Sequence, residues 1–208
     1  MLDKKLFIAI DGPAASGKGT IASLLAKDLN LPVLHTGNIY RAIAYKIWQS
    51  KQDPNDLKHN LIYANSLKAS DLDNQNLQNE EIGKYASIIS VDPSLRSATY
   101  KFQRDFIENS DGAVIEGRDI GTVICPEAKF KFYITADVEV RAKRRCMQQK
   151  HISYEAILAD LKQRDERDLN RAVAPLKPAA DAVIIDSSRM SVDQTLKEIQ
   201  NIIKDNQE

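Results

Sequence analysis

Five short apolar runs recur along the chain, each about as long as a buried strand. They cover residues 6–10, 32–35, 112–117, 130–135 and 182–186. The runs are nearly continuous rather than alternating, apart from one or two polar residues in the third and fourth, which is typical of parallel strands covered on both faces. Helical spacing lies between them at 20–29, 137–150 and 191–204, with Asp137 and Ser191 as predicted N-caps. The pattern predicts an α/β fold, a five-stranded parallel sheet with helices on both faces.

Two stretches interrupt this alternation of strands and helices. Residues 37–111 are polar and helix-rich without a convincing core strand, which predicts a lobe inserted into the core. The charged stretch of about 143–165 predicts a small lid. We therefore expect one domain over residues 1–208, with its core formed by 1–36 and 112–208.

A glycine-rich loop follows the first predicted strand and precedes the first predicted helix. Its pattern, G-x4-G-K, is that of a phosphate-binding loop, in which backbone N–H groups and the helix N-terminus face an anion. A glycine-rich turn with a surface lysine is the alternative, and the flanking strand and helix argue against it. The loop predicts a P-loop NTPase-type sheet. Its residues are Gly12, Pro13, Ala14, Ala15, Ser16, Gly17, Lys18, Gly19 and Thr20.

The loop departs from the usual pattern directly after its lysine. Gly19 stands where a Ser or Thr normally supplies a hydroxyl to Mg²⁺, and Thr20 follows. The Mg²⁺ ligands therefore stay open, with Ser16, Thr20 and Glu116 as candidates. Glu116 closes the third apolar run, where it could hold a water of the Mg²⁺ shell.

Arginines gather in the second half of the chain, and only Arg41 precedes residue 96. Arginine offers a planar fork of donors that matches phosphate oxygens. HTGNIYR (35–41) and EGRDIGTV (116–123) each follow a predicted strand, at the carboxyl end where ligands bind in open α/β sheets. In 161–176, Arg164, Asp168 and Arg171 recur at helical spacing and are expected on one helix face. The alternatives are a solvated helix arginine for Arg41, a salt bridge in a turn for 116–123, and a solvated charged face for 161–176.

Composition narrows the class of partner. Lys+Arg and Asp+Glu both number 29, so the formal net charge is zero and general attraction to nucleic acid or anionic membrane is not expected. No apolar run approaches the ~18 residues of a membrane span. The two cysteines are far apart and in no CxxC pattern, which favours a reducing cytoplasm over a disulfide framework. We expect a cytoplasmic monomer with small-molecule substrates.

Taken together, GPAASGKGT, TGNIYRA, EGRDIGTV and RDERDLNRAVAPL resemble, in this order, the motifs of bacterial cytidylate kinases, a family of nucleoside monophosphate kinases. DPSLR (92–96), preceded by Ser87, is similar to the larger insert of that family. The resemblance covers nearly the whole chain and is weakest over 42–86. It implies phosphorylation of CMP, and of dCMP, by ATP with Mg²⁺.

The same resemblance implies a role for each matching residue. The loop from Gly12 to Thr20 would hold the ATP phosphates, with Lys18, Arg118 and Arg171 acting in catalysis. A lid arginine would close on ATP, with Arg141, Arg144 and Arg145 as candidates. The CMP site would be formed by Thr36 (where the family often has serine), Arg41, Ser87, Arg96, Arg118, Asp119, Arg164, Asp168 and Arg171.

The expected chemistry needs charge rather than a base. A phosphate acceptor is already anionic, so alignment and charge neutralisation would carry the reaction, and none of His35, His59 or His151 lies in a triad-like context. A kinase acting on UMP, AMP or a plain alcohol is the nearest alternative. A GTPase switch is disfavoured because the chain has no NKxD motif, and a nucleic-acid-binding module by the neutral charge.

Overall fold

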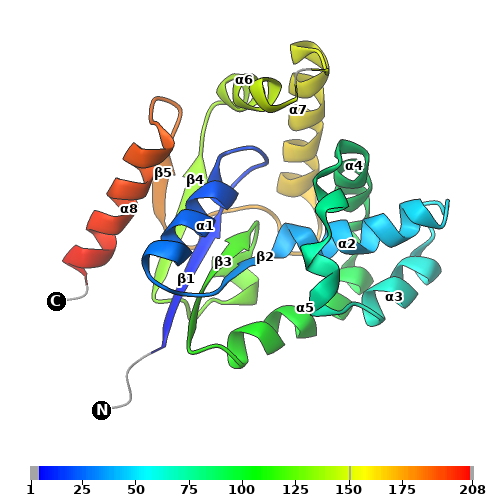
Figure 1. Ribbon diagram of the computed structural model, residues 1–208, viewed down its shortest axis with the longest axis horizontal. Helices are drawn as coiled ribbons and strands as arrows, with labels where there is room; N and C mark the ends of the chain where they lie inside the picture. Colours follow the sequence, from blue (N-terminus) through cyan, green and yellow to red (C-terminus); the bar gives the residue numbers. More distant parts are fainter. Residues whose placement is uncertain (1–4, 150, 207–208) are drawn as a thin grey trace. The chain divides into compact units, whose positions relative to one another are not determined.

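A parallel five-stranded sheet carries the fold (Figure 1). The computed structural model describes residues 5–149 and 151–206. The strands lie in the order β2-β3-β1-β4-β5, and β1 pairs in parallel with β3 and with β4, as β4 does with β5. The strands are β1 (Leu6–Asp11), β2 (Val33–His35), β3 (Gly112–Gly117), β4 (Phe130–Thr135) and β5 (Val183–Asp186). All five fall on the predicted apolar runs, so the predicted fold class is confirmed.

All five strands were predicted to be buried on both faces. This prediction is confirmed for the interior strand β3 and is wrong for β5. All six residues of β3 are buried. In β5, Val183 is 40% exposed and Ile184 is 60% exposed, while Ile185 is buried. The reason is position, because β5 stands last in the sheet, beside β4. An apolar run identifies a strand but does not distinguish an edge from the centre.

The chain folds as two compact units. One, the core unit, contains the residues up to Leu34 and from Ser110 onward, and the other, the helical unit, is His35–Asn109. These bounds differ by two residues at each end from the predicted 37–111. Thr36, expected in the core, therefore belongs to the helical unit, where it begins the first helix.

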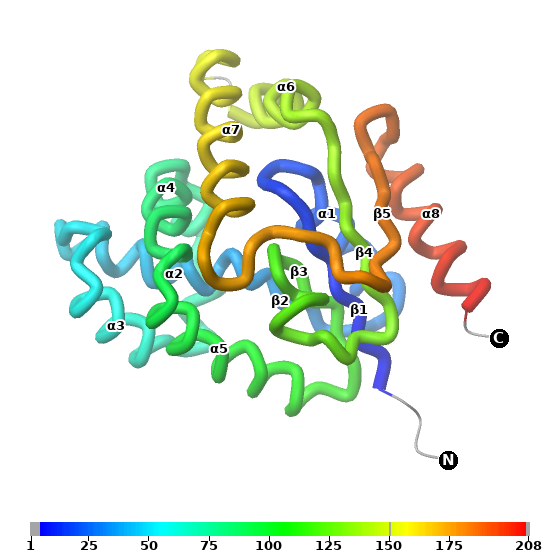
Figure 2. The backbone as a smooth tube through the Cα atoms, turned by 180° about the vertical axis from the view of Figure 1, so that it is seen from behind, coloured from blue at the N-terminus to red at the C-terminus, as the bar shows by residue number. Residues whose placement is uncertain are grey.

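The helices of the core unit are α1 (Lys18–Asp28), α6 (Val138–Gln148), α7 (Tyr154–Asn170) and α8 (Val192–Asp205). Ile21 of α1 and Ile199 of α8 pack with Ile8, Val114 and Phe132 of the strands in one buried cluster. Figures 1 and 2 show α1 and α8 on the same side of the sheet, while the segment that follows α7 crosses the opposite side. The carboxyl ends of the strands are therefore framed by α1, α7 and that segment.

The helical unit is built on its own buried cluster. Its helices are α2 (Thr36–Gln49), α3 (Leu57–Asn65), α4 (Glu80–Ile89) and α5 (Pro93–Glu108), with 3₁₀ turns at Ala69–Asp73 and Gln75–Gln78. Side-chain oxygens of Asp56, Asn79 and Asp92 accept backbone N–H groups at the starts of α3, α4 and α5. Ile43 of α2 and Ile82 of α4 lie in the shared apolar cluster. Apart from His35, the last residue of β2, the described residues of this unit contain no strand, as the polar, helix-rich pattern predicted.

The two predicted N-caps turned out differently. Ser191 caps α8 in a capping box, accepting from the Gln194 N–H while the Gln194 side chain accepts from the Ser191 N–H. Asp137 holds the N-cap position of α6, but its side chain makes no capping hydrogen bond there. Its own N–H instead donates to Ser188 Oγ at 2.9 Å. The Asp137 carboxylate was therefore wrongly predicted as a cap.

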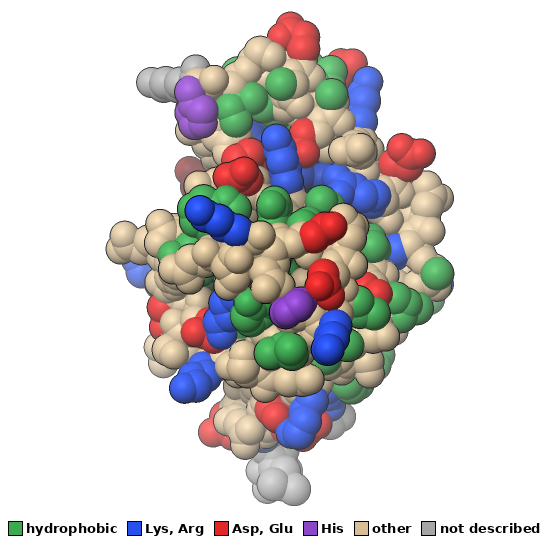
Figure 3. Space-filling view, turned by 90° about the vertical axis from the view of Figure 1, so that its right-hand side faces the viewer, with side chains coloured by type: hydrophobic (Ala, Val, Ile, Leu, Met, Phe, Trp, Pro, Cys, Tyr) green, Lys and Arg blue, Asp and Glu red, His purple; other side chains and the backbone are tan. Residues whose placement is uncertain are grey.

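The surface carries both signs of charge. On the face in Figure 3, Lys and Arg side chains are interspersed with Asp and Glu, which matches the equal totals of 29 in the sequence. No helix in residues 5–149 and 151–206 is long and apolar enough to cross a membrane.

Candidate active site

The loop between β1 and α1 has the backbone shape that its glycines allow. Gly12 has φ 149°, and a Cβ there would lie 2.0 Å from the carbonyl oxygen of Ile134 on β4, so no side chain fits. Gly17, the N-cap of α1, is left-handed with φ 89°. Ala15 also has a left-handed φ of 58°, although it is not glycine. The predicted strand–loop–helix context of the phosphate loop is present.

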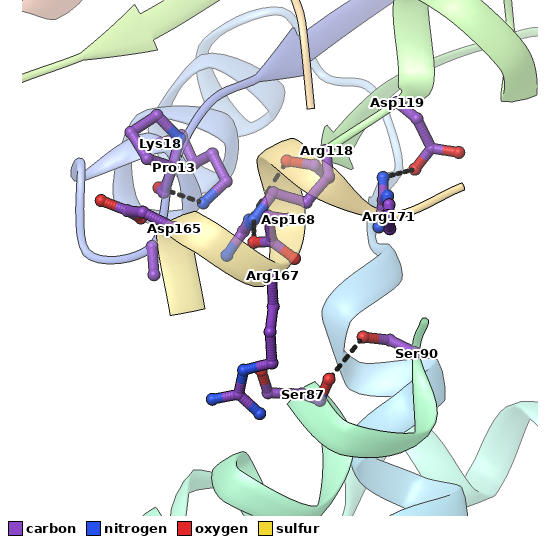
Figure 4. Close-up of polar contacts among 12 residues, drawn as sticks. Pro13, Lys18, Ser87, Ser90, Arg118, Asp119, Asp165, Arg167, Asp168 and Arg171 are labelled. Atoms are coloured by element: carbon purple, nitrogen blue, oxygen red, sulfur yellow. Dashed lines mark hydrogen bonds and ion pairs between the residues drawn. The ribbon is translucent and has the colours of Figure 1, made fainter. Parts of the chain in front are cut away.

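Lys18 lies inside this loop rather than on the surface. It is 5% exposed, and its Nζ donates to the Pro13 carbonyl at 3.0 Å and lies 3.3 Å from Glu116 Oε1 (Figure 4). Burial, and after it the nearby Arg118 cation, lower the pKa of Lys18 to about 8, although Glu116 acts in the opposite direction. The surface-lysine alternative is therefore wrong.

The three candidate Mg²⁺ ligands differ in environment. Ser16 is 2% exposed, and its Oγ has no hydrogen-bond partner. Glu116 is buried beside Lys18, whereas Thr20 is exposed on α1. A buried hydroxyl and a buried carboxylate are oxygen ligands of the kind that Mg²⁺ takes. Ser16 and Glu116 therefore fit the ion better than Thr20 does.

The turn after β3 is tied to the end of α7 by two ion pairs. Arg118 Nε lies 2.8 Å from Asp168 Oδ2, and Arg171 Nη2 lies 3.3 Å from Asp119 Oδ1 (Figure 4). Asp119, Asp168 and Arg171 are 5%, 8% and 7% exposed. Burial alone would lower the pKa of Arg118, but the carboxylates of Asp168 and Glu116 outweigh it and raise that pKa. The salt bridge considered for 116–123 is therefore present in the turn. The two ion pairs also bring residues of the 116–123 motif next to residues of the 161–176 motif.

The expected single helix face for 161–176 is only partly correct. Arg164 and Asp168 lie on α7, and the Arg164 Nε is 2.8 Å from Asp160 Oδ2 one turn earlier. Arg171 lies beyond the helix, in extended backbone with ψ 139°, and donates to the carbonyl of Ala174 as well as to Asp119. All three side chains are buried, so the solvated charged face is wrong for them.

The candidate lid arginines Arg141 and Arg144 are bonded to other groups of the protein. Arg141 is buried and donates to the carbonyls of Ala136 and Ala14, at 2.8 and 3.0 Å, and to both oxygens of Asp165. Arg144 donates to the Ser187 carbonyl at 2.6 Å. Arg145 lies in the last turn of α6. Arg141 thus joins α6, α7 and the phosphate loop.

In the helical unit, Arg41 lies against the start of α4. Its Nη1 donates to the carbonyls of Leu77 and Asn79, the latter at 3.3 Å. A Cβ on Gly83 of α4 would lie 2.8 Å from the Arg41 guanidinium. Arg41 is therefore half-buried and bonded to the protein, rather than fully solvated as the alternative supposed. Thr36, at the start of α2, is 5% exposed.

Arg96, on α5, is bonded to the end of α4, the helix that carries Ser87. Arg96 is buried, and its Nη1 donates to the Ser90 carbonyl at 3.2 Å. Ser90 Oγ donates to the Ser87 carbonyl at 3.2 Å (Figure 4). The Arg96 guanidinium also lies 5.8 Å from the centre of the Tyr40 ring, a cation–π contact. Arg96 is thus bonded to the residue that follows α4, three positions after Ser87.

Two groups at the core unit's site were missed in the sequence. Asp11, the last residue of β1, is 3% exposed and accepts N–H groups from the turn after Asp119. Asp165 is the carboxylate partner of Arg141. For Asp11 a signal was present, because a charged residue closes an otherwise apolar strand directly before the loop. For Asp165 no local pattern distinguishes it from the other acids of the same helix.

The parallel sheet with a phosphate loop between β1 and α1 defines a P-loop kinase fold. Two solved structures share it: a shikimate kinase from Bacteroides thetaiotaomicron (TM-score 0.50, 13% identity, 96% of this chain and 98% of that one) and a gluconokinase from Sinorhizobium meliloti (TM-score 0.51, 10% identity, 98% of each). At these identities the likeness concerns the fold alone.

The sequence comparisons go further. The family model of cytidylate kinases matches residues 8–205. Cytidylate kinases of Rhodospirillum rubrum and Paramagnetospirillum magneticum are 44% and 46% identical, covering 95% and 94% of this chain and 97% and 96% of their own. The chain belongs to the cytidylate kinase family, as the motifs predicted, and it is an enzyme that phosphorylates a nucleoside monophosphate.

Proposed function

We propose that the enzyme transfers the γ-phosphoryl group of ATP to the phosphate of CMP, and of dCMP, in a single in-line step. A CMP phosphate oxygen attacks the γ-phosphorus, the bond from that phosphorus to the β,γ-bridging oxygen breaks, and ADP leaves. The observation that carries the proposal is the placement of Lys18, Arg118 and Arg171 within one unit, each beside a buried carboxylate.

Lys18 is proposed to bind the γ-phosphoryl group of ATP while that group is transferred. Its Nζ bonds to a carbonyl of its own loop and lies near Glu116, so a phosphate that binds here has to replace those contacts. A buried cation interacts with charge far more strongly than an exposed one does. This supports a role for Lys18 in stabilising the charge that develops during transfer.

Arg118 and Arg171 are proposed to hold the acceptor phosphate together with Arg41. The ion pairs with Asp168 and Asp119 fix the planes of both guanidinium groups before a ligand arrives. Hydrogen-bond donors that are already oriented do not have to reorient when charge develops in the transition state, so they stabilise that charge more effectively. Because the acceptor oxygen is already anionic, the mechanism asks for no general base.

Asp119 is proposed to select cytosine, with Ser87 and Arg96 completing the base site. Cytosine presents an amino donor at N4, where uracil presents an acceptor at O4, and a carboxylate accepts from the first and repels the second. Asp168 and Arg164 are assigned to the ribose side. The support is that Asp119 and Asp168 are buried and each is paired with a proposed phosphate-binding arginine, Arg171 and Arg118 respectively.

Mg²⁺ is proposed to be held by Ser16 and Glu116 together with the ATP phosphates. In kinase sites the ion usually takes one or two protein oxygens and otherwise water and substrate phosphate, so it needs no larger cluster of ligands. In residues 5–149 and 151–206 no group of three or more His, Cys, Asp or Glu side chains could hold a metal. When bound, the ion would neutralise charge on the β- and γ-phosphates.

The helical unit is proposed to bind the monophosphate, and the stretch of about 143–165 to close over ATP. Closure would keep water from the γ-phosphate, which would otherwise be hydrolysed. Small-angle scattering with and without a bisubstrate analogue tests this, because closure requires a smaller radius of gyration with the analogue bound.

The experiment that tests the proposed function is ADP release with CMP, dCMP, UMP and AMP measured side by side. CMP and dCMP are expected to give the highest kcat/KM. Lys18→Ala is the control and should reduce ADP release with every acceptor. Equal rates with all four acceptors, or ADP release that does not depend on an acceptor, would contradict the proposal.

A further inference from the structure

Asp11 closes β1 at the point where the sheet meets two loops with different proposed tasks. On its carboxyl side the next residue is Gly12, the first of the phosphate loop. Its Oδ1 accepts the Ile120 N–H and its Oδ2 accepts the Gly121 N–H, both at 2.8 Å. Those amides directly follow Arg118 and Asp119. One carboxylate thus bonds the turn proposed to read CMP to the strand that leads into the ATP loop.

The packing around this contact leaves little freedom. Asp11 is 3% exposed, and Ile120 and Gly121 are buried. A Cβ on Gly121 would lie 3.4 Å from Asp11 Oδ2 and 3.2 Å from Lys131 Cδ, so the turn lies in close contact with both the carboxylate and the Lys131 chain. The amides belong to the short π-helical turn Ile120–Ile124, which begins at Asp119. The placement of Asp119 is therefore linked to the bonds made one and two residues later.

Only a carboxylate fits both amides. Two N–H groups need two acceptor oxygens, and an ionised aspartate supplies both. Asparagine has the same shape but turns one oxygen into an NH₂ donor, which would face an N–H. The buried amide left without an acceptor would then lose its hydrogen bond entirely.

We propose that Asp11 is a positioning residue for the monophosphate site, holding the Arg118–Asp119 turn in register without touching either substrate. The inference deepens the proposed function and rests on it, because its kinetic consequence is defined for CMP as acceptor. It assigns to β1 a task in acceptor recognition separate from that of the phosphate loop that follows it.

The charges around Asp11 give the contact a dependence on pH. The pKa of Asp11 is raised to about 6, chiefly by burial and also by the carboxylates of Asp119 and Glu116, while the hydrogen bonds from the two amides act to lower it. From β4, Tyr133 stands opposite Asp11 in the register, and the Lys131 chain passes Gly121 with its Nζ 2.6 Å from Asp181. Protonation of Asp11 below this pH replaces one acceptor by a hydroxyl and weakens the hold on the turn.

The test uses Asp11→Asn in the full-length enzyme, with KM measured separately for CMP and ATP. We expect KM for CMP to rise at least about tenfold, because misplacement of about an ångström is costly for a bound substrate, with KM for ATP changing less than about threefold. Thr195→Val is the matched control. It removes a buried hydroxyl whose Oγ1 donates to the Ser191 carbonyl at 2.9 Å in α8, and should leave both KM values unchanged.

A pH profile separates positioning from general damage to the fold. The second pKa of the CMP phosphate also lies near 6, so the profile of the wild type alone is ambiguous. That titration is common to both enzymes and cancels in the ratio of wild-type to Asp11→Asn kcat/KM for CMP. The ratio is expected to be constant above about pH 7 and to fall toward one below pH 6. A ratio that does not change with pH overturns the inference.

Amide exchange tests the contact without activity. In wild type the Ile120 and Gly121 amides should exchange slowly, and Asp11→Asn should accelerate both while amides of the β1–β4 pairing keep their protection. If Asp11→Asn does not fold, Asp11→Glu provides the second variant, because it keeps both acceptor oxygens but adds a methylene that pushes them toward the turn, and it should raise KM for CMP. Unchanged exchange, or equal rises in both KM values, overturns the inference. An inactive wild type would instead contradict the proposed function and leave the exchange test valid.

Discussion

Arg141 and Asp165 join α6 to α7 by a two-pronged ion pair, with Nη2 2.6 Å from Oδ2 and Nη1 3.2 Å from Oδ1. The same guanidinium donates to the carbonyl of Ala14 in the phosphate loop. Their side chains are 5% and 17% exposed, so the pair is largely withdrawn from water. The contact connects the predicted lid to the loop that it is expected to cover.

Asp165→Ala should destabilise the protein strongly. Removing one partner leaves the buried Arg141 charge uncompensated, which typically costs about 3–5 kcal/mol. Urea unfolding measures the loss. The control is Asp105→Ala, which breaks a 2.6 Å pair with Lys101 whose side chains are 49% and 81% exposed, and should cost less than about 1 kcal/mol. An equal decrease in the free energy of unfolding for the two variants would show that the buried pair stabilises the fold no more than the exposed pair does.

Alkaline pH should inactivate the enzyme through Lys18. Its pKa is lowered to about 8, chiefly by burial, so the charged form is lost as pH rises through that value. The kcat/KM for ATP is expected to fall about tenfold per pH unit above pH 8, since this parameter reports groups of the free enzyme. Lys18→Arg keeps its charge through this range and should lose the alkaline fall, even at lower absolute activity. The same fall in both enzymes would assign it to another group.

Asp119→Asn should weaken discrimination between CMP and UMP. The amide keeps the shape of the side chain but can donate to the uracil O4, so the CMP/UMP ratio of kcat/KM should drop about 5- to 150-fold, the equivalent of about 1–3 kcal/mol. Asp111→Asn is the control, because that carboxylate is fully exposed on the surface beside Lys5. An unchanged ratio in Asp119→Asn would remove Asp119 from base selection.

Ala15→Gly and Ala14→Gly should act differently on stability. Ala15 has φ 58°, where a Cβ costs about 1–2 kcal/mol, so glycine relieves strain that offsets its greater freedom in the unfolded chain. We expect Ala15→Gly to be neutral or to stabilise by up to about 1 kcal/mol. Ala14 has no positive φ and is 6% exposed, so Ala14→Gly should destabilise by at least about 0.5 kcal/mol. Thermal unfolding of both variants is the measurement, and matching losses would contradict the argument.

The sheet and the phosphate loop could be predicted because each depends on local chemistry. Apolar runs of strand length, and glycines placed before a lysine at a helix start, produce the same structure wherever they occur. Gly12 illustrates this, because its close approach to Ile134 excludes every side chain. The resemblance of four motifs then identified the family, which the comparisons confirmed.

What could not be predicted depends on partners distant in sequence. Helical spacing put Arg171 on the face of α7, but the helix ends at Asn170 and Arg171 turns toward Asp119, 52 residues earlier. Asp11 finds its partners more than a hundred residues later. No periodicity within a segment encodes such pairings, since they arise only when the strands are assembled. The individual roles in the CMP site remain predictions for the same reason.

Five cations at the core unit's site each face a carboxylate, and four of them, all but Arg118, are buried. This arrangement affects how substrates reach the site. The pairs are Lys18–Glu116, Arg118–Asp168, Arg141–Asp165, Arg164–Asp160 and Arg171–Asp119. Opposite charges a few ångströms apart cancel beyond a Debye length, about 8 Å at physiological ionic strength. The rate at which nucleotides encounter the enzyme should therefore depend little on salt. Selectivity for anions would then arise after encounter, when a substrate phosphate replaces a carboxylate as the partner of a cation, rather than from long-range electrostatic attraction.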